Sequence, residues 1–289
     1  MRIKKFITHQ YSKLMHSYYH KIAAHRYIEK YKKDFEHAEY FVIFLGYPRS
    51  GHTLLGAMLN AHPDAMIAHE YHALKHIDQH ENRYDLFAHL MAQHNWFSSR
   101  GHNWTGYSYK IPSGWQGKYR ALKVIGDKRG GASSRILYED PHRLDRLQAL
   151  VNIPVKVIIV HRNPFDNIAT RARGGNYYKR NPDKREIDKE ITKHFRDVET
   201  INSFKQKGTI DYLEVKHEQF VEHPKAHLSQ LCHFLNITQE GTYIEACLKT
   251  VRPSRSLSRN KIDWTKYQIQ QINKLNSRYD FLKDYTFEP

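Results

Sequence analysis

The chain of 289 residues has only two cysteines, Cys232 and Cys247, and neither stands in a Cys-x-x-Cys or other metal-like spacing. We interpret both as reduced side chains, and Cys232, which lies among leucines, as a small buried hydrophobe. The 21 histidines are scattered, and no His-Glu-x-x-His or similar motif sets two imidazoles on one helix face. The sequence therefore predicts no metal site.

Long apolar runs are also missing. The run at Tyr40–Leu45 is far shorter than the roughly 20 residues that a membrane span needs. Residues 1–7 carry charges but no apolar segment followed by a small-residue cleavage site, as a secretory signal would. We therefore expect a soluble, cytoplasmic protein.

Acidic residues are few relative to basic ones. Lysine and arginine number 46 against 30 for aspartate and glutamate, which gives a net charge of +16 and an isoelectric point near 9.6. This excess favours a polyanionic partner, whether nucleic acid, acidic lipid or a phosphorylated cofactor. Net charge alone does not choose among them, so motifs must.

The basic excess is strongest at the N-terminus, where residues 2–27 hold six basic groups and no acid. Apolar residues recur there at helical spacing, so we predict a basic amphipathic helical segment over 1–39 and a separate domain over 40–289. Contact of residues 2–27 with a membrane surface is an alternative. A helix folded back onto the domain is preferred because tryptophan anchors are missing.

From Tyr40 onward, short apolar runs alternate with helical patterns, which is typical of βαβ units and a parallel sheet. The fold class predicted is therefore α/β, with three layers in which helices flank a central parallel sheet. The predicted strands are Tyr40–Leu45, Ala65–Ala68, Leu122–Ile125, Val155–Val160 and Ile210–Val215. The predicted helices are Thr53–Ala61, Arg143–Val151, Pro164–Arg173, Asp183–Lys207, Pro224–Leu235 and Thr265–Tyr279.

A glycine turn, Gly46-Tyr-Pro-Arg-Ser-Gly-His-Thr53, connects the first predicted strand to the first predicted helix of this domain. Two glycines five residues apart let backbone N–H groups and the helix N-terminus face an anion. The spacing fits a P-loop, except that His52 stands where a nucleotide-hydrolysing enzyme has its lysine. Arg49 is then the nearest cation, and its guanidinium can donate two hydrogen bonds to phosphoryl or sulfuryl oxygens.

A second basic site follows the strand predicted at Val155–Val160, which ends in His161-Arg162 where a kinase or ATPase usually has an acid for Mg²⁺. Positive charge at the carboxyl end of a strand in an open α/β sheet indicates that an anion is bound without a metal. Thr170 lies eight residues after Arg162 on the predicted helix, within reach of the same ligand.

Taken together, these residues resemble the sulfotransferases that use 3′-phosphoadenosine 5′-phosphosulfate. In that family a Pro-Arg/Lys-Ser-Gly-Thr-Thr turn binds the 5′-phosphosulfate, and an arginine with a serine eight residues later binds the 3′-phosphate. Residues 48–53 match the first element, and Arg162 with Thr170 matches the second. The departures are His52 in place of a threonine and Thr170 in place of a serine.

Other segments are similar to the same family and its bacterial members. Residues 59–63, Leu-Asn-Ala-His-Pro, resemble the tyrosyl-protein sulfotransferases, and that alignment places Glu70 on their catalytic carboxylate. Asp127-Lys128 resembles the lysine-bearing segment after a central strand, and residues 212–224 resemble the late strand and helix. Residues 252–259 with Trp264 resemble the C-terminal segment that covers the cofactor.

The resemblance implies in-line, metal-free sulfuryl transfer to a hydroxyl or amine, with adenosine 3′,5′-bisphosphate as the product. Glu70 would be the general base, with His69 and His72 as second choices, and Arg49 and Lys128 would neutralise the developing charge. The implied cofactor-binding residues are Arg49, Ser50, Gly51, His52, Thr53, Leu54, Arg162, Thr170, Arg255 and Arg259.

Two other functions remain open. A metal-dependent nucleotide kinase fits the P-loop shape but not His52, and a nucleic-acid-binding protein fits the charge and the aromatic residues but not two paired anion sites. We expect no nucleic acid partner. The acceptor, whether a small molecule, a glycan or a peptide, is not encoded in any motif. We expect Asn95–Lys118 to be a long loop, and Trp104 and Trp115 suggest that it forms an acceptor lid.

Overall fold

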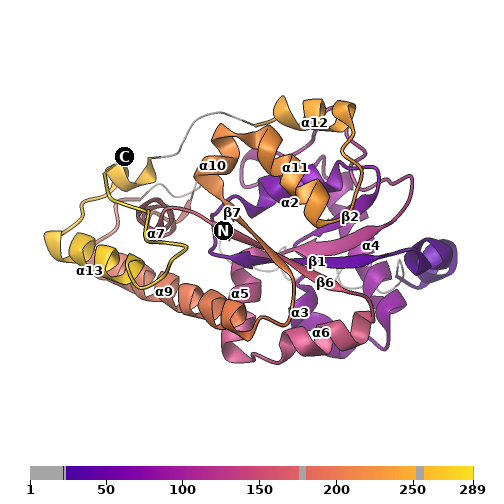
Figure 1. The fold of residues 1–289 in the computed structure, drawn as a ribbon, viewed down its shortest axis with the longest axis horizontal. Helices are drawn as coiled ribbons and strands as arrows, with labels where there is room; N and C mark the ends of the chain where they lie inside the picture. Colours follow the sequence, from indigo (N-terminus) through magenta and orange to yellow (C-terminus); the bar gives the residue numbers. More distant parts are fainter. Residues whose placement is uncertain (1–21, 23, 176–179, 252–256, 289) are drawn as a thin grey trace, which may run out of the picture.

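The computed structural model describes residues 22, 24–175, 180–251 and 257–288 (Figure 1). At its centre lies a five-stranded sheet in the order β2-β5-β1-β6-β7, and every neighbouring pair of strands is parallel. The strands are β1 (Tyr40–Gly46), β2 (Ala65–His69), β5 (Val124–Lys128), β6 (Val155–His161) and β7 (Tyr212–Lys216). The predicted α/β class with a central parallel sheet is confirmed.

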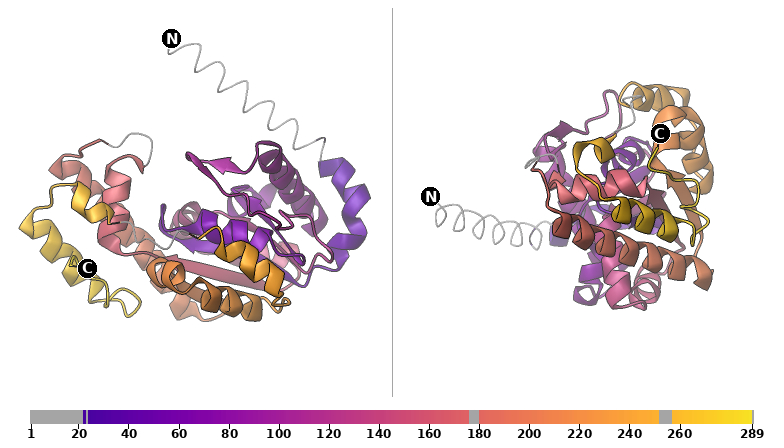
Figure 2. Two further views of the ribbon diagram at one scale, coloured as in Figure 1. Left: turned by 90° about the horizontal axis from the view of Figure 1, so that it is seen from above. Right: turned by 90° about the vertical axis from the view of Figure 1, so that its left-hand side faces the viewer.

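Helices cover both faces of the sheet and one end of the molecule. Those matching predictions are α2 (His52–Asn60), α6 (Arg143–Val151), α7 (Pro164–Ala172), α9 (Lys184–Lys207), α11 (Pro224–Phe234) and α13 (Lys266–Asn276). Those that the periodicity did not reveal are α3 (Ala73–His76), α4 (Arg83–Ser99), α5 (Gly130–Glu139), α10 (His217–Glu222) and α12 (Gly241–Leu248). Figures 1 and 2 show α13 lying along α9.

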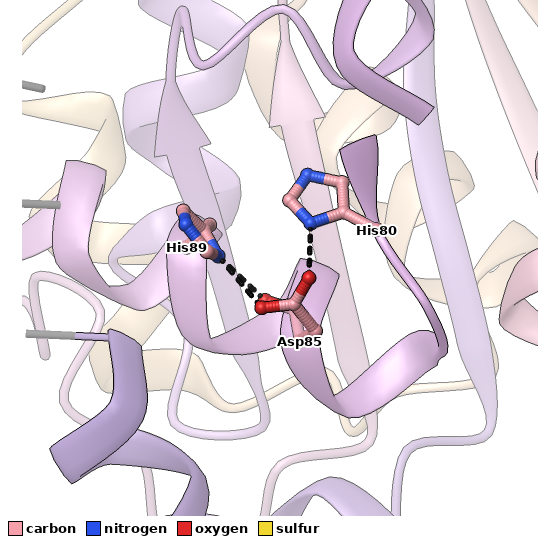
Figure 3. A group of neighbouring side chains, drawn as sticks. All are labelled: His80, Asp85 and His89. Atoms are coloured by element: carbon pink, nitrogen blue, oxygen red, sulfur yellow. Dashed lines mark hydrogen bonds and ion pairs between the residues drawn. The ribbon is translucent and has the colours of Figure 1, made fainter. Parts of the chain in front are cut away.

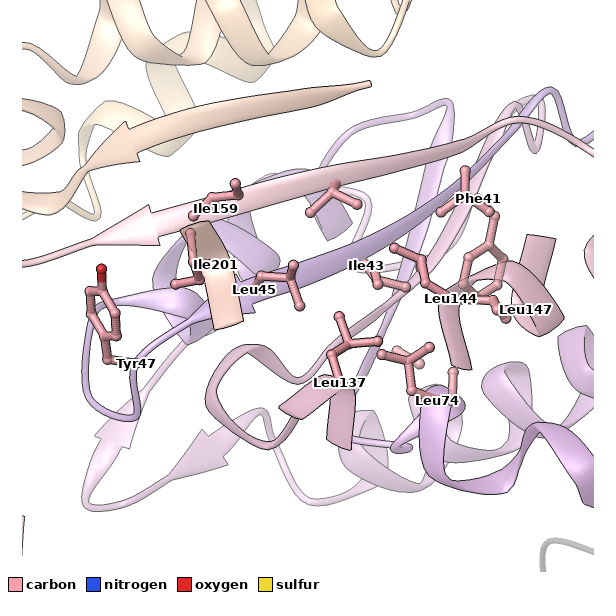
Figure 4. Close-up of a cluster of buried hydrophobic side chains, with 14 of the residues drawn as sticks. Phe41, Ile43, Leu45, Tyr47, Leu74, Leu137, Leu144, Leu147, Ile159 and Ile201 are labelled. Atoms are coloured by element: carbon pink, nitrogen blue, oxygen red, sulfur yellow. The ribbon is translucent and has the colours of Figure 1, made fainter. Parts of the chain in front are cut away.

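Strand β1 explains why two cores form. Successive side chains of a strand point to opposite faces of its sheet. Phe41, Ile43 and Leu45 pack into the core on the side of α3, α5, α6 and α9 (Figure 4), whereas Val42 and Phe44 pack into the core on the side of α2, α11 and α12. Both faces of β1 are buried, so its sequence is a continuous apolar run rather than an alternation.

Side-chain caps set several helix starts. Asn82 accepts hydrogen bonds from the N–H groups of Tyr84 and Asp85 at the start of α4, and Asn163 precedes Pro164 at the start of α7. Both α9 and α13 begin with reciprocal capping boxes, Asp183 with Glu186 and Thr265 with Gln268. These caps satisfy N–H groups that have no partner inside the helix.

The N-terminal prediction falls largely on residues outside the described ranges, because 1–21 and 23 are not described. Residues 24–36 are helical and pack onto the domain. Phe35 contacts Phe87 edge to face at 5.8 Å, and Tyr119 donates a hydrogen bond to Asp34. No helix of the described residues is long and apolar enough to cross a membrane.

The predicted long loop at Asn95–Lys118 is wrong at its start. Helix α4 continues to Ser99, and a short antiparallel pair follows, β3 (Asn103–Trp104) with β4 (Tyr107–Ser108). The apolar residues of α4 surround the helix instead of forming one stripe, so no helical period was visible. Only residues 109–118 match the expected irregular segment.

Candidate active site

The glycine turn leaves β1 at the carboxyl edge of the sheet and enters α2. Gly51 caps the helix with φ 96°, a left-handed conformation that costs glycine little, and its missing Cβ leaves room for the His217 ring. No side chain of the described residues caps α2. The N–H groups of His52 and Thr53 are therefore available as donors for an anion, whereas that of Leu54 donates to the carbonyl of Gly51 at 3.0 Å.

Hydrogen bonds from the side chains of Asn167 and Arg162 hold this turn in place. Asn167 donates from Nδ2 to the carbonyl of Pro48 at 2.7 Å and to Oγ of Ser50 at 3.2 Å, while Arg162 donates to the carbonyl of Arg49. Burial lowers the pKa of Arg162, although nearby carboxylates oppose the shift. The two predicted anion sites, after β1 and after β6, are thus adjacent and joined by a hydrogen bond.

His52 does not occupy the place of a phosphate-binding lysine. Its imidazole is buried and lies 3.2 Å from the carbonyl oxygen of Leu45, and burial lowers its pKa to about 3. At neutral pH the ring is uncharged and donates an N–H to that carbonyl. Any contact of His52 with an anion would therefore come from its backbone N–H.

Lys128 brings the other predicted residues together. From the end of β5 its Nζ donates to Oε1 of Glu70 at 2.8 Å and to Oγ1 of Thr53 at 3.0 Å. The stem of Lys128 crosses α2 at Gly56, where a Cβ would come within 2.5 Å of Cγ of Lys128. A carboxylate, an ammonium group and the first turn of α2 thus lie within hydrogen-bonding reach of one another.

Burial lowers the pKa of both Lys128 and its neighbour Arg129. Burial lowers the pKa of Lys128 to about 7, and the Asp127 carboxylate opposes the shift. Burial also lowers the pKa of Arg129 to about 10, and Arg129 forms a second salt bridge with Glu70, at Oε2. Sequence reasoning missed Arg129, although its place beside Lys128 at the end of a parallel strand was the available signal.

Asp127 positions the segment that carries Glu70. Its buried carboxylate accepts hydrogen bonds from the N–H of Tyr71 at 2.9 Å and the N–H of Ala73 at 2.8 Å. Glu70 and His72 have φ angles of 60° and 69°, a left-handed conformation that is strained for such residues. Burial raises the pKa of Asp127 to about 6, and these N–H groups oppose the rise.

The two histidines named as alternative bases are poorly suited to that role. His69 stacks on Phe97 with ring centroids 3.8 Å apart, and burial lowers its pKa to about 2. Burial lowers the pKa of His72 to about 4. Neither ring is a competent proton acceptor near neutral pH, because efficient bases have a pKa near the working pH.

A pocket opens beside Lys128 and Thr53. Its wall combines residues of α2, β2 and α4 with side chains from the segment after α4: Thr53, Gly56, Ala57, Asn60, Ile67, Ala68, His69, Phe97, His102, Tyr109, Gln116 and Lys128. Trp104 contacts His69 edge to face at 4.8 Å, just behind this wall. Trp115 is 41% exposed and does not line the pocket.

The remaining predicted residues have different surroundings. Thr170 is partly buried on α7, and its hydroxyl donates to the carbonyl of Asp166 at 2.7 Å. Arg255 lies outside the described residues. Arg259 is buried, forms a salt bridge with Asp166 at 2.6 Å and donates to the carbonyls of Thr286 and Phe287. Its guanidinium therefore fastens the C-terminal segment to α7.

A sequence profile of the sulfotransferase family matches residues 42–241. Sulfotransferase STF9 from Mycobacterium avium aligns over 89% of this chain and 81% of its own, with 10% identity and a TM-score of 0.50. Mouse sulfotransferase SULT7A1 complexed with PAP aligns over 83% and 84%, with 14% identity and a TM-score of 0.49. The likeness to STF9 shows a common fold. No curated protein sequence matches the chain.

Proposed function

Since this chain belongs to the sulfotransferase family, we propose that it transfers a sulfuryl group from 3′-phosphoadenosine 5′-phosphosulfate to a hydroxyl or amine. One observation carries the proposal. Lys128 donates both to Thr53, in the first turn of α2, and to Glu70, so an anion cradle and a carboxylate meet at one ammonium group. Sulfuryl transfer needs this combination, a cationic cradle for the donor next to a base for the acceptor.

The donor end is supported by the turn and its surroundings. The guanidinium of Arg49 and the backbone N–H groups of Ser50, Gly51, His52 and Thr53 would bind the 5′-phosphosulfate. The N–H of Leu54, which was predicted to contribute, already donates to the carbonyl of Gly51. Arg162 and Thr170 would bind the 3′-phosphate. The hydrogen bond from Arg162 to the carbonyl of Arg49 supports assigning both groups to one nucleotide. We assign Arg259 no direct contact with the nucleotide, because its guanidinium already forms a salt bridge with Asp166 and donates to two backbone carbonyls.

The chemical step follows from the contacts of Glu70. Its carboxylate would take the proton from the acceptor while the acceptor oxygen or nitrogen bonds to sulfur and the bond from sulfur to the phosphate oxygen breaks. Lys128 and Arg129 would neutralise negative charge on the sulfuryl and leaving oxygens. The products are the sulfated acceptor and adenosine 3′,5′-bisphosphate, and the step uses no metal.

The acceptor would enter the pocket beside Lys128. Its wall mixes aromatic side chains such as Phe97 and Tyr109 with small and polar residues, and Lys128 lies at its edge. The acceptor hydroxyl or amine would therefore lie beside the ammonium group of Lys128.

The structure bears on the kinase alternative through Asp127. This carboxylate lies near the carboxyl end of β5, next to β1, where a P-loop enzyme has its Mg²⁺-binding acid. Both of its oxygens accept backbone N–H groups, from Tyr71 and Ala73. The carboxylate is therefore engaged in holding the segment that carries Glu70, which favours the sulfotransferase.

A melting experiment decides between the two enzymes without knowledge of the acceptor. Adenosine 3′,5′-bisphosphate should stabilise the protein more than ADP does, with or without Mg²⁺. At about 100 times its Kd a ligand adds roughly 2.7 kcal/mol, which in a chain of this size raises Tm by about 5 °C. Equal stabilisation by ADP with Mg²⁺ would overturn the proposal in favour of the kinase.

Two arginine variants refine this experiment. Arg162→Ala should remove most of the preference for the 3′-phosphate, because a charge-assisted contact is lost from one ligand only. Arg49→Ala should weaken the binding of both nucleotides, adenosine 3′,5′-bisphosphate and ADP. Arg146→Ala is the matched control, since Arg146 is a partly exposed arginine of α6 whose salt bridges lie with Asp78 and Asp140.

A further inference from the structure

Two imidazoles and one carboxylate meet where α4 begins (Figure 3). Nδ1 of His80 lies 2.7 Å from Oδ2 of Asp85, and Nδ1 of His89 lies 3.2 Å from Oδ1 of the same carboxylate. The rings of His80 and His89 are in edge-to-face contact, with centroids 4.8 Å apart. Among the described residues, one nitrogen from each ring and one carboxylate oxygen all lie within 4.8 Å of one another.

Local structure fixes this grouping. Asp85 and His89 are four residues apart in α4 and so share one face of the helix. His80 reaches them from the short connection that precedes the helix, which Asn82 then caps. The spacing His-x₄-Asp-x₃-His includes a residue outside the helix, so a search of the sequence for two imidazoles on one helix face does not find it.

We propose that His80, Asp85 and His89 bind one divalent transition metal ion, with Zn²⁺ as the best match. Two imidazoles and one carboxylate are a known ligand set for zinc, in which three protein ligands leave a fourth position for water. Bonds of about 2.0 to 2.2 Å set tetrahedral ligand atoms roughly 3.3 Å apart. The three ligand atoms lie within 4.8 Å of one another, so binding would draw these side chains closer together.

Exposure and charge fit an ion arriving from solvent. The side chain of His80 is only 2% exposed, whereas those of Asp85 and His89 are 24% and 17% exposed. The buried imidazole would form the inner side of the site, and the other two would form its entrance.

Tyr71 completes the site. Its hydroxyl lies 2.9 Å from Nε2 of His80, the ring nitrogen opposite the one that faces Asp85. Metal-binding histidines usually donate their second N–H to such a partner, which fixes the ring and its tautomer. On binding, the ion would take the place of the proton that the neutral His80 ring carries on Nδ1 toward Asp85, and the ring would change tautomer so that its one proton lies on Nε2, with no net proton released. The bound ring would then donate Nε2–H to the hydroxyl oxygen of Tyr71.

This proposal does not depend on the sulfotransferase assignment. The binding test uses the full chain, treated with a chelator and titrated with Zn²⁺ against a competing metal indicator. The chain has 21 histidines, so weak background binding is expected in every variant. In the wild type the proposed site should bind one equivalent of Zn²⁺ more tightly than that background. Each of the variants His80→Ala, Asp85→Asn and His89→Gln removes one ligand and should lower the affinity for that equivalent at least tenfold.

Two further variants separate a metal site from a hydrogen-bonded cluster. Tyr71→Phe removes only the hydroxyl and should lower the affinity for Zn²⁺ about 10- to 100-fold. His142→Ala is the control, because His142 is an exposed histidine with a single carboxylate neighbour, Asp145. It should leave the tight equivalent unchanged.

The effect of Zn²⁺ on Tm tests the site even in a variant that is less stable. Zn²⁺ should raise Tm of the wild type and not of His89→Gln, and Co²⁺ should show the visible absorption of a tetrahedral site in the wild type alone. A variant that melts early without metal is scored by its Zn²⁺-dependent shift in Tm, not by its absolute value. No tight equivalent in the wild type, or one that persists in all three ligand variants, would overturn the proposal.

Discussion

Lys128 and Glu70 form a salt bridge at the carboxyl edge of the sheet, with Nζ of Lys128 2.8 Å from Oε1 of Glu70. Arg129 binds the other carboxylate oxygen of Glu70. Without substrate, therefore, the proposed base is held by two cations. A bound sulfuryl donor would offer these cations new oxygens, and Glu70 would then be released to accept a proton. If Glu70 is the base, the salt bridge would make donor binding a condition for base catalysis.

The role of Glu70 is tested by Glu70→Gln, which keeps the shape of the side chain and removes its basicity. We expect kcat to fall by about 10²- to 10⁴-fold, the usual contribution of a general base. The affinity for adenosine 3′,5′-bisphosphate should stay the same or rise, because Lys128 and Arg129 lose a competing carboxylate. Turnover within a few fold of wild type would remove Glu70 as the base.

The path of Lys128 across α2 predicts a second effect. Gly56→Ala places a Cβ within 2.5 Å of Cγ of Lys128, so the ammonium group must move away from Thr53 and Glu70. We expect at least a tenfold loss in kcat in the folded protein, together with a lower Tm because the new Cβ also comes within 2.9 Å of Cβ of Lys128, measured by steady-state kinetics and thermal melting. Gly241→Ala is the control, since no atom lies within 4 Å of its Cβ position. Equal activity of the two variants would show that the position of Lys128 does not matter.

The segment after α4 is proposed to close on the acceptor, and its two tryptophans should differ. Trp104 supports His69 in the pocket wall, whereas Trp115 is exposed. Trp104→Ala should raise KM for the acceptor several fold without changing the affinity for adenosine 3′,5′-bisphosphate, and Trp115→Ala should change neither. Kinetic constants for any sulfated acceptor check this. Unchanged KM in Trp104→Ala would contradict a lid.

Buried histidines make stability depend on pH. Burial lowers the pKa of His94 to about 4, so between about pH 6.5 and 4 the unfolded chain binds a proton there that the folded protein does not. Stability is fully present above pH 6.5 and is lost as pH falls through this window, by about 2 kcal/mol between pH 7 and pH 5 for one such histidine.

Urea unfolding at pH 7, 6 and 5 measures this slope. His94→Gln should flatten it by about 2 kcal/mol over that interval. His142→Gln, a change at an exposed ring, should keep the slope of the wild type. Parallel slopes for His94→Gln and the wild type would show that His94 becomes charged in the folded protein at a cost no greater than in the unfolded chain.

The sheet was predictable where both faces of a strand are apolar. Strand β1 is a continuous apolar run, and β6 is interrupted only by Lys156 before His161. Both were predicted to within one residue. Strand β5 was placed two residues too early, at Leu122 instead of Val124, because Gly126, Asp127 and Lys128 are polar or small and did not indicate a strand. These residues are buried in the strand because Asp127 and Lys128 serve the site.

Two helices were missed for opposite physical reasons. Helix α4 is apolar around most of its surface and so shows no stripe, while α5 begins with Gly130-Gly131-Ala-Ser-Ser, residues that favour helices weakly apart from the alanine. Both helices are stabilised by packing against the rest of the fold, and the local sequence pattern carries no signal of that packing.

Within the site, residues that lie in a contiguous motif were found and residues that meet only through the fold were not. The glycine turn and Arg162 were found from spacing, and Glu70 from the family resemblance. Arg129, the loop contacts of Asp127 and the grouping of His80 with Asp85 and His89 depend on segments brought together by the sheet. The roles of the predicted residues in donor binding remain predictions.

The strand order also bears on how the protein is synthesised. Strand β1 is central, but its neighbours β5 and β6 end only at Lys128 and His161, so β1 has neither partner when it leaves the ribosome. At about 5 to 20 residues per second, on the order of ten seconds pass before the second partner is complete. During that interval the apolar segment Phe41–Leu45 has two unpaired edges, which makes it a binding site for chaperones and the first place where the nascent chain would aggregate.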